Sequence, residues 1–327
     1  MERLRALFAS IIGSSAEAVA LVPATSYGFA VAARNLRLRA GDRVLVLADE
    51  YPSGIYTWRA AAQRSDAEIL TVSRGPGQGW TDAVLDALDE RVAIVSVPNV
   101  HWTDGALLDL AAIAHRTHEL EAALVIDASQ SAGAMPLDVG ALRPDFLVSV
   151  GYKWLLGPFS VGYLYVAEHH HSGEPLEENW ISRAGSEDFA ALVDYRDEYQ
   201  PGARRFDSGQ RTKFELVPMA IAALEQILEW RVARIAATLA HTTSDIARQA
   251  TALGVSCAPD DERGPHLLGL HLPDHARARA GEAIASVNCY AARRGGSLRI
   301  APHLHTTDED VRRLLEGLAL ALQPSSP

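Results

Sequence analysis

Six short apolar runs alternate with helical patterns through the first half of the chain, and this alternation most constrains the fold. The strand candidates cover residues 43–50, 67–74, 91–99, 122–129, 144–151 and 161–167. Most are continuous apolar runs, which is typical of parallel strands that helices cover on both faces. The pattern therefore predicts an α/β layer architecture around a mostly parallel sheet. A short loop containing Gly157 and Pro158 joins the last two strands, which we expect to run antiparallel.

The pattern changes near residue 214, which predicts a second, smaller domain. A long helical stretch covers residues 215–253, and further strand and helix patterns alternate up to a closing helix. Thr307 precedes three acidic residues at the start of that helix, an arrangement typical of a helix N-terminus. We expect a large α/β domain over residues 1–213 and a small C-terminal α+β domain over residues 214–327, with the long helix between them.

Charge and composition disfavour several classes of function. The 327 residues carry a formal net charge of -11 and no basic block, which argues against a nucleic-acid partner. The apolar runs are too short to cross a membrane, and the first residues resemble an amphipathic helix more than a signal peptide. Cys257 and Cys289 are the two cysteines, so no disulfide framework is implied and a cytoplasmic location fits.

Polar and aromatic residues gather where the predicted strands end. Open α/β sheets bind ligands at the carboxyl ends of their strands. Asp127 lies near the end of the fourth run, and Tyr152 and Lys153 follow the fifth. Packing alone does not explain such residues at every strand end, so this edge of the sheet is predicted to carry the functional site.

A lysine and a carboxylate at neighbouring strand ends match the needs of an enzyme that uses pyridoxal 5'-phosphate (PLP). The lysine amine forms a Schiff base with the PLP aldehyde, and the carboxylate keeps the pyridine nitrogen protonated. The phosphate needs a helix N-terminus, and residues 23–36 supply one. Taken alone, Lys153 would be read as a surface lysine, but its combination with Asp127 favours the Schiff base.

The stretch from VIDASQSAG (125–133) through GYKWLLGP (151–158) resembles the fold-type I PLP enzymes of the class V aminotransferase group. That group includes cysteine desulfurases, kynureninases and isopenicillin N epimerase-like proteins. The resemblance covers nearly the whole chain and implies a mostly parallel seven-stranded sheet covered by helices. It implies Lys153 as the Schiff-base lysine, Asp127 as the partner of the pyridine nitrogen and Gln130 beside the ring hydroxyl.

The resemblance also implies further contacts with the cofactor and the substrate. EYPSGIY (50–56) is similar to a kynureninase stretch whose aromatic residue stacks on the PLP ring, and VHWTDG (100–105) is similar to a substrate-site turn. The residues implied are Ala24, Thr25 and Tyr152 at the phosphate, Tyr51 on the ring, and His101 and Trp102 near the substrate.

Two later segments resemble signatures of the same group. RRFDSGQ (204–210) is similar to a loop that reaches the phosphate site of the neighbouring subunit, so Ser208, Gly209 and Gln210 imply a homodimer. In GGSLRIAPHLHTTDEDV (295–311), Arg299 matches the arginine that binds the substrate carboxylate, a role that suits a planar guanidinium.

The chain departs from its relatives at several points. Kynureninases carry a histidine where Gln130 stands, which argues against kynurenine hydrolysis. The loop YAARRGG (290–296) lacks the nucleophilic cysteine of desulfurases, which argues against desulfuration. Relatives usually have an extra segment before the first helix, so this N-terminus is expected to be short. No metal site is expected, because the consecutive residues 169–171, all histidines, cannot all face one ion.

These observations predict a PLP-dependent enzyme that acts on an amino acid or a small amine carrying a carboxylate. Transamination of the class V type is placed first because it demands the fewest additional groups. A kynureninase-like hydrolase or lyase and an epimerase stay open as alternatives. From another class, a non-catalytic relative that binds PLP or a partner also stays open.

Overall fold

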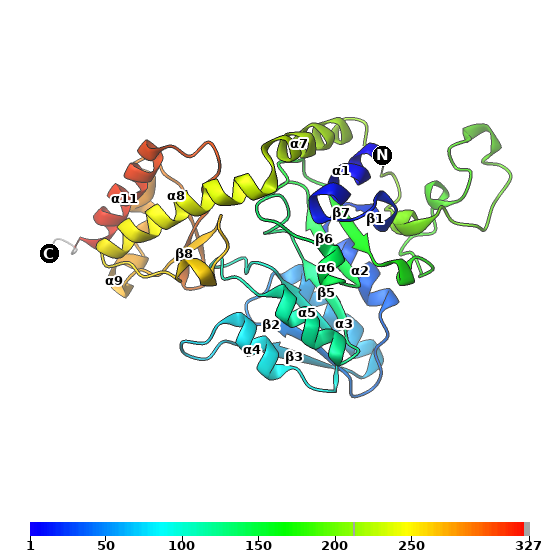
Figure 1. The fold of residues 1–327 in the computed structure, drawn as a ribbon, viewed down its shortest axis with the longest axis horizontal. Coiled ribbons are helices and arrows are strands. Elements are labelled where there is room, and N and C mark those ends of the chain that lie inside the picture. Colours follow the sequence, from blue (N-terminus) through cyan, green and yellow to red (C-terminus); the bar gives the residue numbers. More distant parts are fainter. Residues whose placement is uncertain (212, 324–327) are drawn as a thin grey trace. The chain divides into compact units, whose positions relative to one another are not determined.

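The computed structural model describes residues 1–211 and 213–323, which form two compact units (Figure 1). The large unit contains Met1–Asn99 and Asp109–Val232, and the small unit contains Val100–Leu108 and the chain from Ala233 onward. The predicted division between residues 213 and 214 stays a prediction about domains. The tertiary contacts instead divide the chain after Val232, and they place Val100–Leu108 in the small unit.

A seven-stranded sheet forms the centre of the large unit, as the resemblance implied. The strand order is β1-β7-β6-β5-β4-β2-β3, and every pairing is parallel except those that β7 makes with β1 and β6. The predicted antiparallel arrangement of the last two strands is thus confirmed. The strands are β1 (Val19–Val22), β2 (Arg43–Leu47), β3 (Glu68–Val72), β4 (Val92–Pro98), β5 (Ala123–Asp127), β6 (Phe146–Val150) and β7 (Gly162–Val166).

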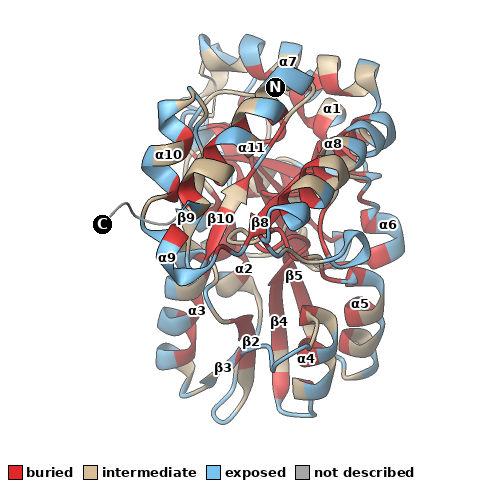
Figure 2. Ribbon diagram, turned by 90° about the vertical axis from the view of Figure 1, so that its left-hand side faces the viewer, coloured by how far each residue is buried: buried red, intermediate tan, exposed pale blue. Residues whose placement is uncertain are grey.

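Helices surround this sheet and bury its apolar side chains. Phe29 and Trp58 lie in one buried cluster with strand residues, and their rings meet edge to face at 6.4 Å. Figure 2 shows that the central strands are almost entirely buried. The helices of this unit are α1 (Glu2–Ile12), α2 (Thr25–Asn35), α3 (Pro52–Ser65), α4 (Trp80–Ala87), α5 (Leu110–Glu119), α6 (Val139–Leu142) and α7 (Leu216–Trp230).

In the part of the chain that the structure describes, one short 3-10 helix precedes β1, and four more lie between β7 and α7. They are η1 (Ala16–Ala18), η2 (Glu168–His170), η3 (Trp180–Ser182), η4 (Phe189–Ala191) and η5 (Gly202–Phe206). The predicted long helix of residues 215–253 is two helices, because Arg231 has a φ of 66° and interrupts the helical hydrogen bonds. A non-glycine residue rarely adopts that conformation. No sequence pattern around Arg231 predicts it.

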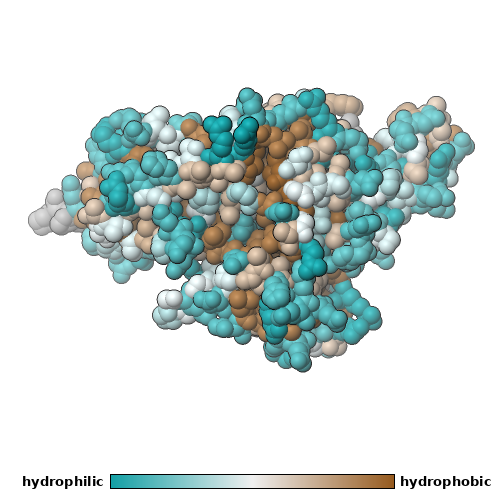
Figure 3. Space-filling model, in the orientation of Figure 1, coloured by the Kyte–Doolittle hydropathy of each residue, from teal (hydrophilic) through white to brown (hydrophobic). Residues whose placement is uncertain are grey.

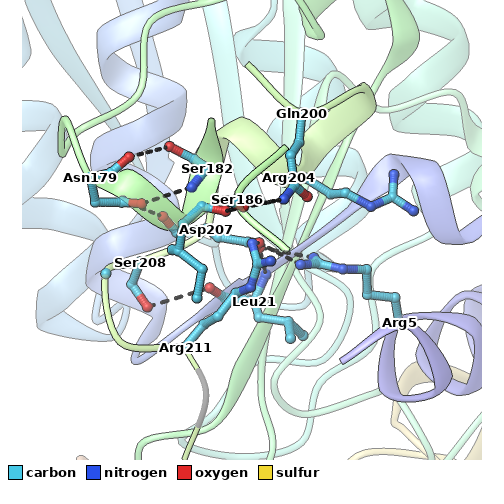
Figure 4. Close-up of polar contacts among 12 residues, drawn as sticks. Arg5, Leu21, Asn179, Ser182, Ser186, Gln200, Arg204, Asp207, Ser208 and Arg211 are labelled. Atoms are coloured by element: carbon cyan, nitrogen blue, oxygen red, sulfur yellow. Dashed lines mark hydrogen bonds and ion pairs between the residues drawn. The ribbon is translucent and has the colours of Figure 1, made fainter. Parts of the chain in front are cut away.

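A buried ion pair fixes α1 to the large unit (Figure 4). The fully buried Arg5 guanidinium binds both carboxylate oxygens of Asp207 and donates to the Val19 carbonyl at 2.7 Å. Asp207 also accepts from the Leu21 amide at 2.7 Å and from Arg211. Burial alone would lower the pKa of Arg5, but the charge of Asp207 raises it. This network joins α1, β1 and the segment that leads to Ser208.

The small unit packs helices on an antiparallel three-stranded sheet of order β8-β10-β9. Its elements are α8 (Val232–Ala252), η6 (Asp260–Glu262), β8 (Leu268–Leu270), α9 (Asp274–Arg277), α10 (Ala280–Ser286), β9 (Ala292–Arg294), β10 (Ser297–Ile300) and α11 (Asp308–Leu322). The predicted cap of the last helix is confirmed: Thr307 accepts from the Asp310 amide at 3.2 Å, and Asp310 accepts from the Thr307 amide at 2.9 Å.

Hydrophilic side chains cover much of the surface that faces the viewer in Figure 3, in keeping with the net charge of -11. Among the described residues, no helix combines the length and the apolar character needed to cross a membrane.

Candidate active site

Lys153 and Asp127 lie at the same edge of the large sheet. Asp127 is the last residue of β5, and Lys153 follows β6, which pairs with β5 in parallel. The carboxyl ends of parallel strands meet at one edge, so the fold brings these two chemical groups to the position where α/β sheets bind ligands. The Asp127 carboxylate accepts the Ser129 amide at 2.8 Å, which fixes one of its oxygens.

Tyr51 lies beside the lysine. It follows β2 and is the residue directly before α3, whose first residue is Pro52. The Lys153 Nζ is 5.5 Å from the centroid of the Tyr51 ring, within the range of a cation–π contact. Tyr51 and Asp127 line the same small pocket, together with Trp58 and Ser96. The structure therefore brings Tyr51, Asp127 and Lys153, predicted from three separate segments, into one site.

Tyr152 belongs to the same group. Its ring stacks on that of Phe159, with centroids 4.1 Å apart. Burial raises the pKa of the Tyr152 phenol, and the nearby Tyr51 and Asp127 raise it further. Tyr152 is therefore a neutral hydroxyl at physiological pH and can donate a hydrogen bond to an anion.

Gln130 is buried and held by a residue that sequence reasoning missed. Its side-chain carbonyl accepts the Trp154 Nε1–H at 3.0 Å, which orients the amide. The loops that carry the two residues pack tightly at Gly133, which has a φ of 89° and where a Cβ would lie 2.7 Å from the Trp154 carbonyl oxygen. Only glycine fits this approach, so the Asp127 loop and the Lys153 loop hold a fixed relation.

The predicted phosphate loop forms the N-terminus of α2. Ala24, the N-cap residue, is extended and offers no side-chain cap, and the helix begins at the buried Thr25. Amide groups of a first helical turn have no intrahelical acceptor and attract anions. Gly28 lets α2 lie close to β6, since a Cβ there would lie 2.5 Å from Val148 Cγ1.

The loop containing Ser208, Gly209 and Gln210 lies against β1. The Ser208 amide donates to the Leu21 carbonyl at 3.1 Å, and the Gly209 amide donates to a Glu177 carboxylate oxygen at 2.6 Å. Gln210 has a φ of 55°. The Gly209 amide thus already binds an anionic oxygen, although the contacts within this chain do not include Lys153.

Arg299, Trp102 and His101 come together in the small unit. Arg299 Nη1 donates to the Trp102 carbonyl at 2.8 Å. His101 is buried, and its Nδ1 lies 2.7 Å from the Thr103 hydroxyl. Burial lowers the pKa of Arg299, and the charge of Arg294 lowers it further. Arg294 was not singled out by the sequence, because two arginines in an apparent loop carry no distinguishing pattern.

Two of the three consecutive histidines face the same carboxylate. His169 and His170 each place Nε2 2.9 Å from the same Asp145 oxygen, whereas His171 contacts the Val166 carbonyl. Burial would raise the pKa of Asp145, but hydrogen bonds from His170, the Leu124 amide and His169 hold it below its usual value. Among the described residues, Asp145, His169 and His170 alone bring three metal-ligating side chains together. Hydrogen bonds with the carboxylate account for the positions of both imidazoles.

Comparison with protein-family models identifies the family of this chain. The model described as aminotransferase class-V matches residues 1–314. The chain belongs to the aminotransferase class-V family. It is therefore a fold-type I, PLP-dependent enzyme of the class V group, and the resemblance drawn from residues 125–158 is confirmed.

Individual relatives agree with the family but carry different names. The class V chain is 27% identical over 314 residues to an uncharacterized aminotransferase, YcbU, of Bacillus subtilis, covering 95% of this chain and 81% of that one. It is 32% identical to a kynureninase of Deinococcus radiodurans, covering 64% of this chain and 49% of the relative. A solved C-DES mutant with glycine covalently linked to its PLP cofactor has a TM-score of 0.84 at 20% identity, covering 97% and 84% of the two chains.

The residues of the class V chain fit PLP. An amine, an aromatic ring and a carboxylate lie at one sheet edge. The N-terminus of α2, which has no side-chain cap, follows the carboxyl end of β1 at the same edge, because β1 and β6 both run antiparallel to β7. The pocket beside Tyr51 is lined by aromatic and small side chains together with the Asp127 carboxylate, which suits a flat ring with a basic nitrogen.

Proposed function

We propose that this protein binds PLP covalently at Lys153 and transaminates an amino acid. The position of the Lys153 amine 5.5 Å from the Tyr51 ring, with Asp127 ending the adjacent strand, supports this assignment most strongly. PLP, when bound, supplies a ring that withdraws electrons from the α-carbon of the substrate.

Four residues of the large unit are assigned to different parts of the cofactor and the substrate. Asp127 would bind the pyridine N–H with the oxygen that Ser129 leaves available, and the Tyr51 ring would cover one face of the cofactor. Gln130, fixed by Trp154, would lie beside the ring hydroxyl. The Lys153 amine would move the proton at the substrate α-carbon.

The cofactor phosphate would be held by Ala24, Thr25 and Tyr152 of one chain. In a homodimer, Ser208, Gly209 and Gln210 of the neighbouring subunit complete this phosphate site. The Gly209 amide, which here donates to Glu177, shows the kind of donor that a phosphate oxygen accepts.

Arg299 binds the substrate carboxylate, and His101 and Trp102 border the substrate. The Trp102 carbonyl holds one guanidinium nitrogen of Arg299, which orients the remaining donors. The two cysteines, Cys257 and Cys289, are both free, which suits a reducing compartment such as the cytoplasm.

Transamination demands proton transfer only between the substrate α-carbon and the cofactor, which a single amine could carry out. Kynurenine hydrolysis is disfavoured by Gln130, and desulfuration by the lack of a cysteine in residues 290–296. Epimerisation, β-elimination and a non-catalytic role remain outcomes that the experiment separates.

A panel of amino acids tests this proposal. Purified protein with PLP is mixed with each amino acid and assayed for spectral change, keto acid, ammonia and inverted product. Keto acid formed with an amino acceptor supports transamination, whereas inverted amino acid or released ammonia would assign an epimerase or a lyase. A spectral change without any product would indicate a protein that binds amino acids and does not convert them.

A further inference from the structure

The two faces of the small sheet have different characters. Leu298 and Ile300 of β10 are buried in a cluster with residues of α8, α10 and α11. Successive strand residues point to opposite faces, so Ser297 and Arg299 lie on the face away from these helices. The helix-covered face forms the core of the unit, and the other face carries Arg299.

Arg294 lies on the same face as Arg299. In the β9–β10 pairing, Arg299 is opposite Ala292 and Ser297 is opposite Arg294. Arg294 and Arg299 are therefore diagonal neighbours on one face, a separation that long side chains bridge. Like charges in such a pair repel, so the arrangement is unfavourable unless an anion lies between them.

The segment Val100–Leu108 lies against this face of the sheet. Gly269 is opposite Arg299 on β8, and a Cβ at Gly269 would lie 2.7 Å from the Asp104 carbonyl oxygen. Trp102 of this segment accepts a hydrogen bond from Arg299 and places its ring 5.8 Å from the Arg294 guanidinium. Trp102 thus positions both guanidinium groups.

The two guanidinium groups are held by neutral partners. Arg299 contacts the Trp102 carbonyl, Arg294 contacts the Arg293 carbonyl and the Trp102 ring, and no carboxylate of a described residue forms an ion pair with either arginine. Both side chains are half-buried. Two partly desolvated cations on one face, held by neutral groups, form a site for more negative charge than one carboxylate carries.

We propose that the substrate is an amino acid with a second acidic group, whose side-chain carboxylate binds Arg294 while its α-carboxylate binds Arg299. This inference rests on the proposed function, which assigns Arg299 to the α-carboxylate. It makes Arg294 a residue that determines specificity.

Calorimetric titration of the PLP-loaded protein with succinate, glutarate and butyrate tests the inference without turnover. Arg294→Gln removes one of the two charges, and Arg293→Gln is the matched control. Arg293 is exposed and pairs with Leu298, so it lies on the opposite face of the hairpin. The wild-type protein is expected to bind the dicarboxylates about 10- to 100-fold more tightly than butyrate, as expected for one additional charged hydrogen-bonded contact.

Arg294→Gln is expected to abolish this preference, and Arg293→Gln to preserve it. An equal loss for butyrate and dicarboxylates in Arg294→Gln would overturn the inference, because Arg294 would then share the α-carboxylate. An equal effect of the two variants would overturn it as well, since only general charge would be acting. Uptake of PLP, followed by absorbance in the same samples, distinguishes failure of the proposed function from loss of dicarboxylate preference.

Discussion

At the scale of single residues, the account depends on a lysine and a carboxylate that separate segments bring to one edge. Sequence reasoning could find both because Asp127 ends one apolar strand and Lys153 lies three residues after the end of the next strand. It could not find Trp154 as the partner of Gln130 or Arg294 as the neighbour of Arg299, because these contacts depend on loop packing and strand register.

Asp127→Asn tests the carboxylate at this scale. Asparagine can still accept the Ser129 amide but cannot carry the charge that keeps the pyridine nitrogen protonated. We expect the variant to bind PLP at Lys153 and to lose about 10²- to 10³-fold in kcat, the typical cost of removing an electrostatic group from an active site.

The matched control for this variant is Asp138→Asn, in which the altered carboxylate also accepts a backbone amide but caps α6. Its kcat should stay at the wild-type value. Wild-type turnover in Asp127→Asn would show that the carboxylate does not act on the cofactor.

At the scale of elements, the apolar pattern predicted most strands but not all boundaries. Four-residue β1 was missed because so short a run does not stand out from a neighbouring turn, and three-residue β9 was missed for the same reason. The break at Arg231 depends on the positive φ of one residue, and the periodicity of apolar residues does not reveal such a break. The cap at Thr307 was predicted because it is encoded within four consecutive residues.

The buried ion pair between α1 and the η5 segment should be a major source of stability. Arg5→Met leaves Asp207 buried without its bidentate partner, so we expect the free energy of unfolding to fall by about 3–5 kcal/mol. Arg3→Met on the same helix removes an exposed pair with Glu225 and should cost under about 1 kcal/mol. Urea unfolding of both variants measures the difference, and equal losses would refute the special role of Arg5.

The Asp145 carboxylate joins β5, β6 and η2, and it makes stability depend on pH. Its pKa is lower in the folded chain than in the unfolded chain, so its contribution is complete above the unfolded pKa of about 4 and is lost as pH falls through the folded pKa. Asp145→Asn cannot accept at both oxygen positions. We expect it to cost about 1–3 kcal/mol near neutral pH and progressively less in acid.

Urea midpoints measured across the acid range check this expectation. Asp245→Asn, at an exposed ion pair on α8, serves as the control and should show a small difference at every pH. A cost for Asp145→Asn that stays constant down to the lowest pH would contradict the lowered pKa.

At the scale of the whole molecule, the proposed site needs two subunits, and complementation can detect this. Lys153→Ala dimers lack the attachment point, and Gln210→Ala dimers have a weakened phosphate site. When the two variants are unfolded together and refolded, mixed dimers contain one intact site, made by Lys153 of one chain and Gln210 of the other. We expect tight PLP binding to reappear in the mixture, measured by absorbance titration.

The homodimer arrangement predicts a stoichiometry of one tight site per mixed dimer. If the refolded mixture binds PLP no better than the average of the two parents, Gln210 acts within its own chain.

The sequence predicted the family of the whole chain well because its motifs lie in continuous stretches. It could not predict that Val100–Leu108 joins the small unit, since that depends on tertiary contacts alone.

The central claim is that Lys153 holds PLP, and borohydride reduction followed by peptide mass analysis tests it most directly. The account predicts a visible absorbance band with added PLP that disappears on reduction and leaves the pyridoxyl mass on the peptide containing Lys153. Absence of the band, or the label on Lys213, the one other lysine of the sequence, would contradict the account.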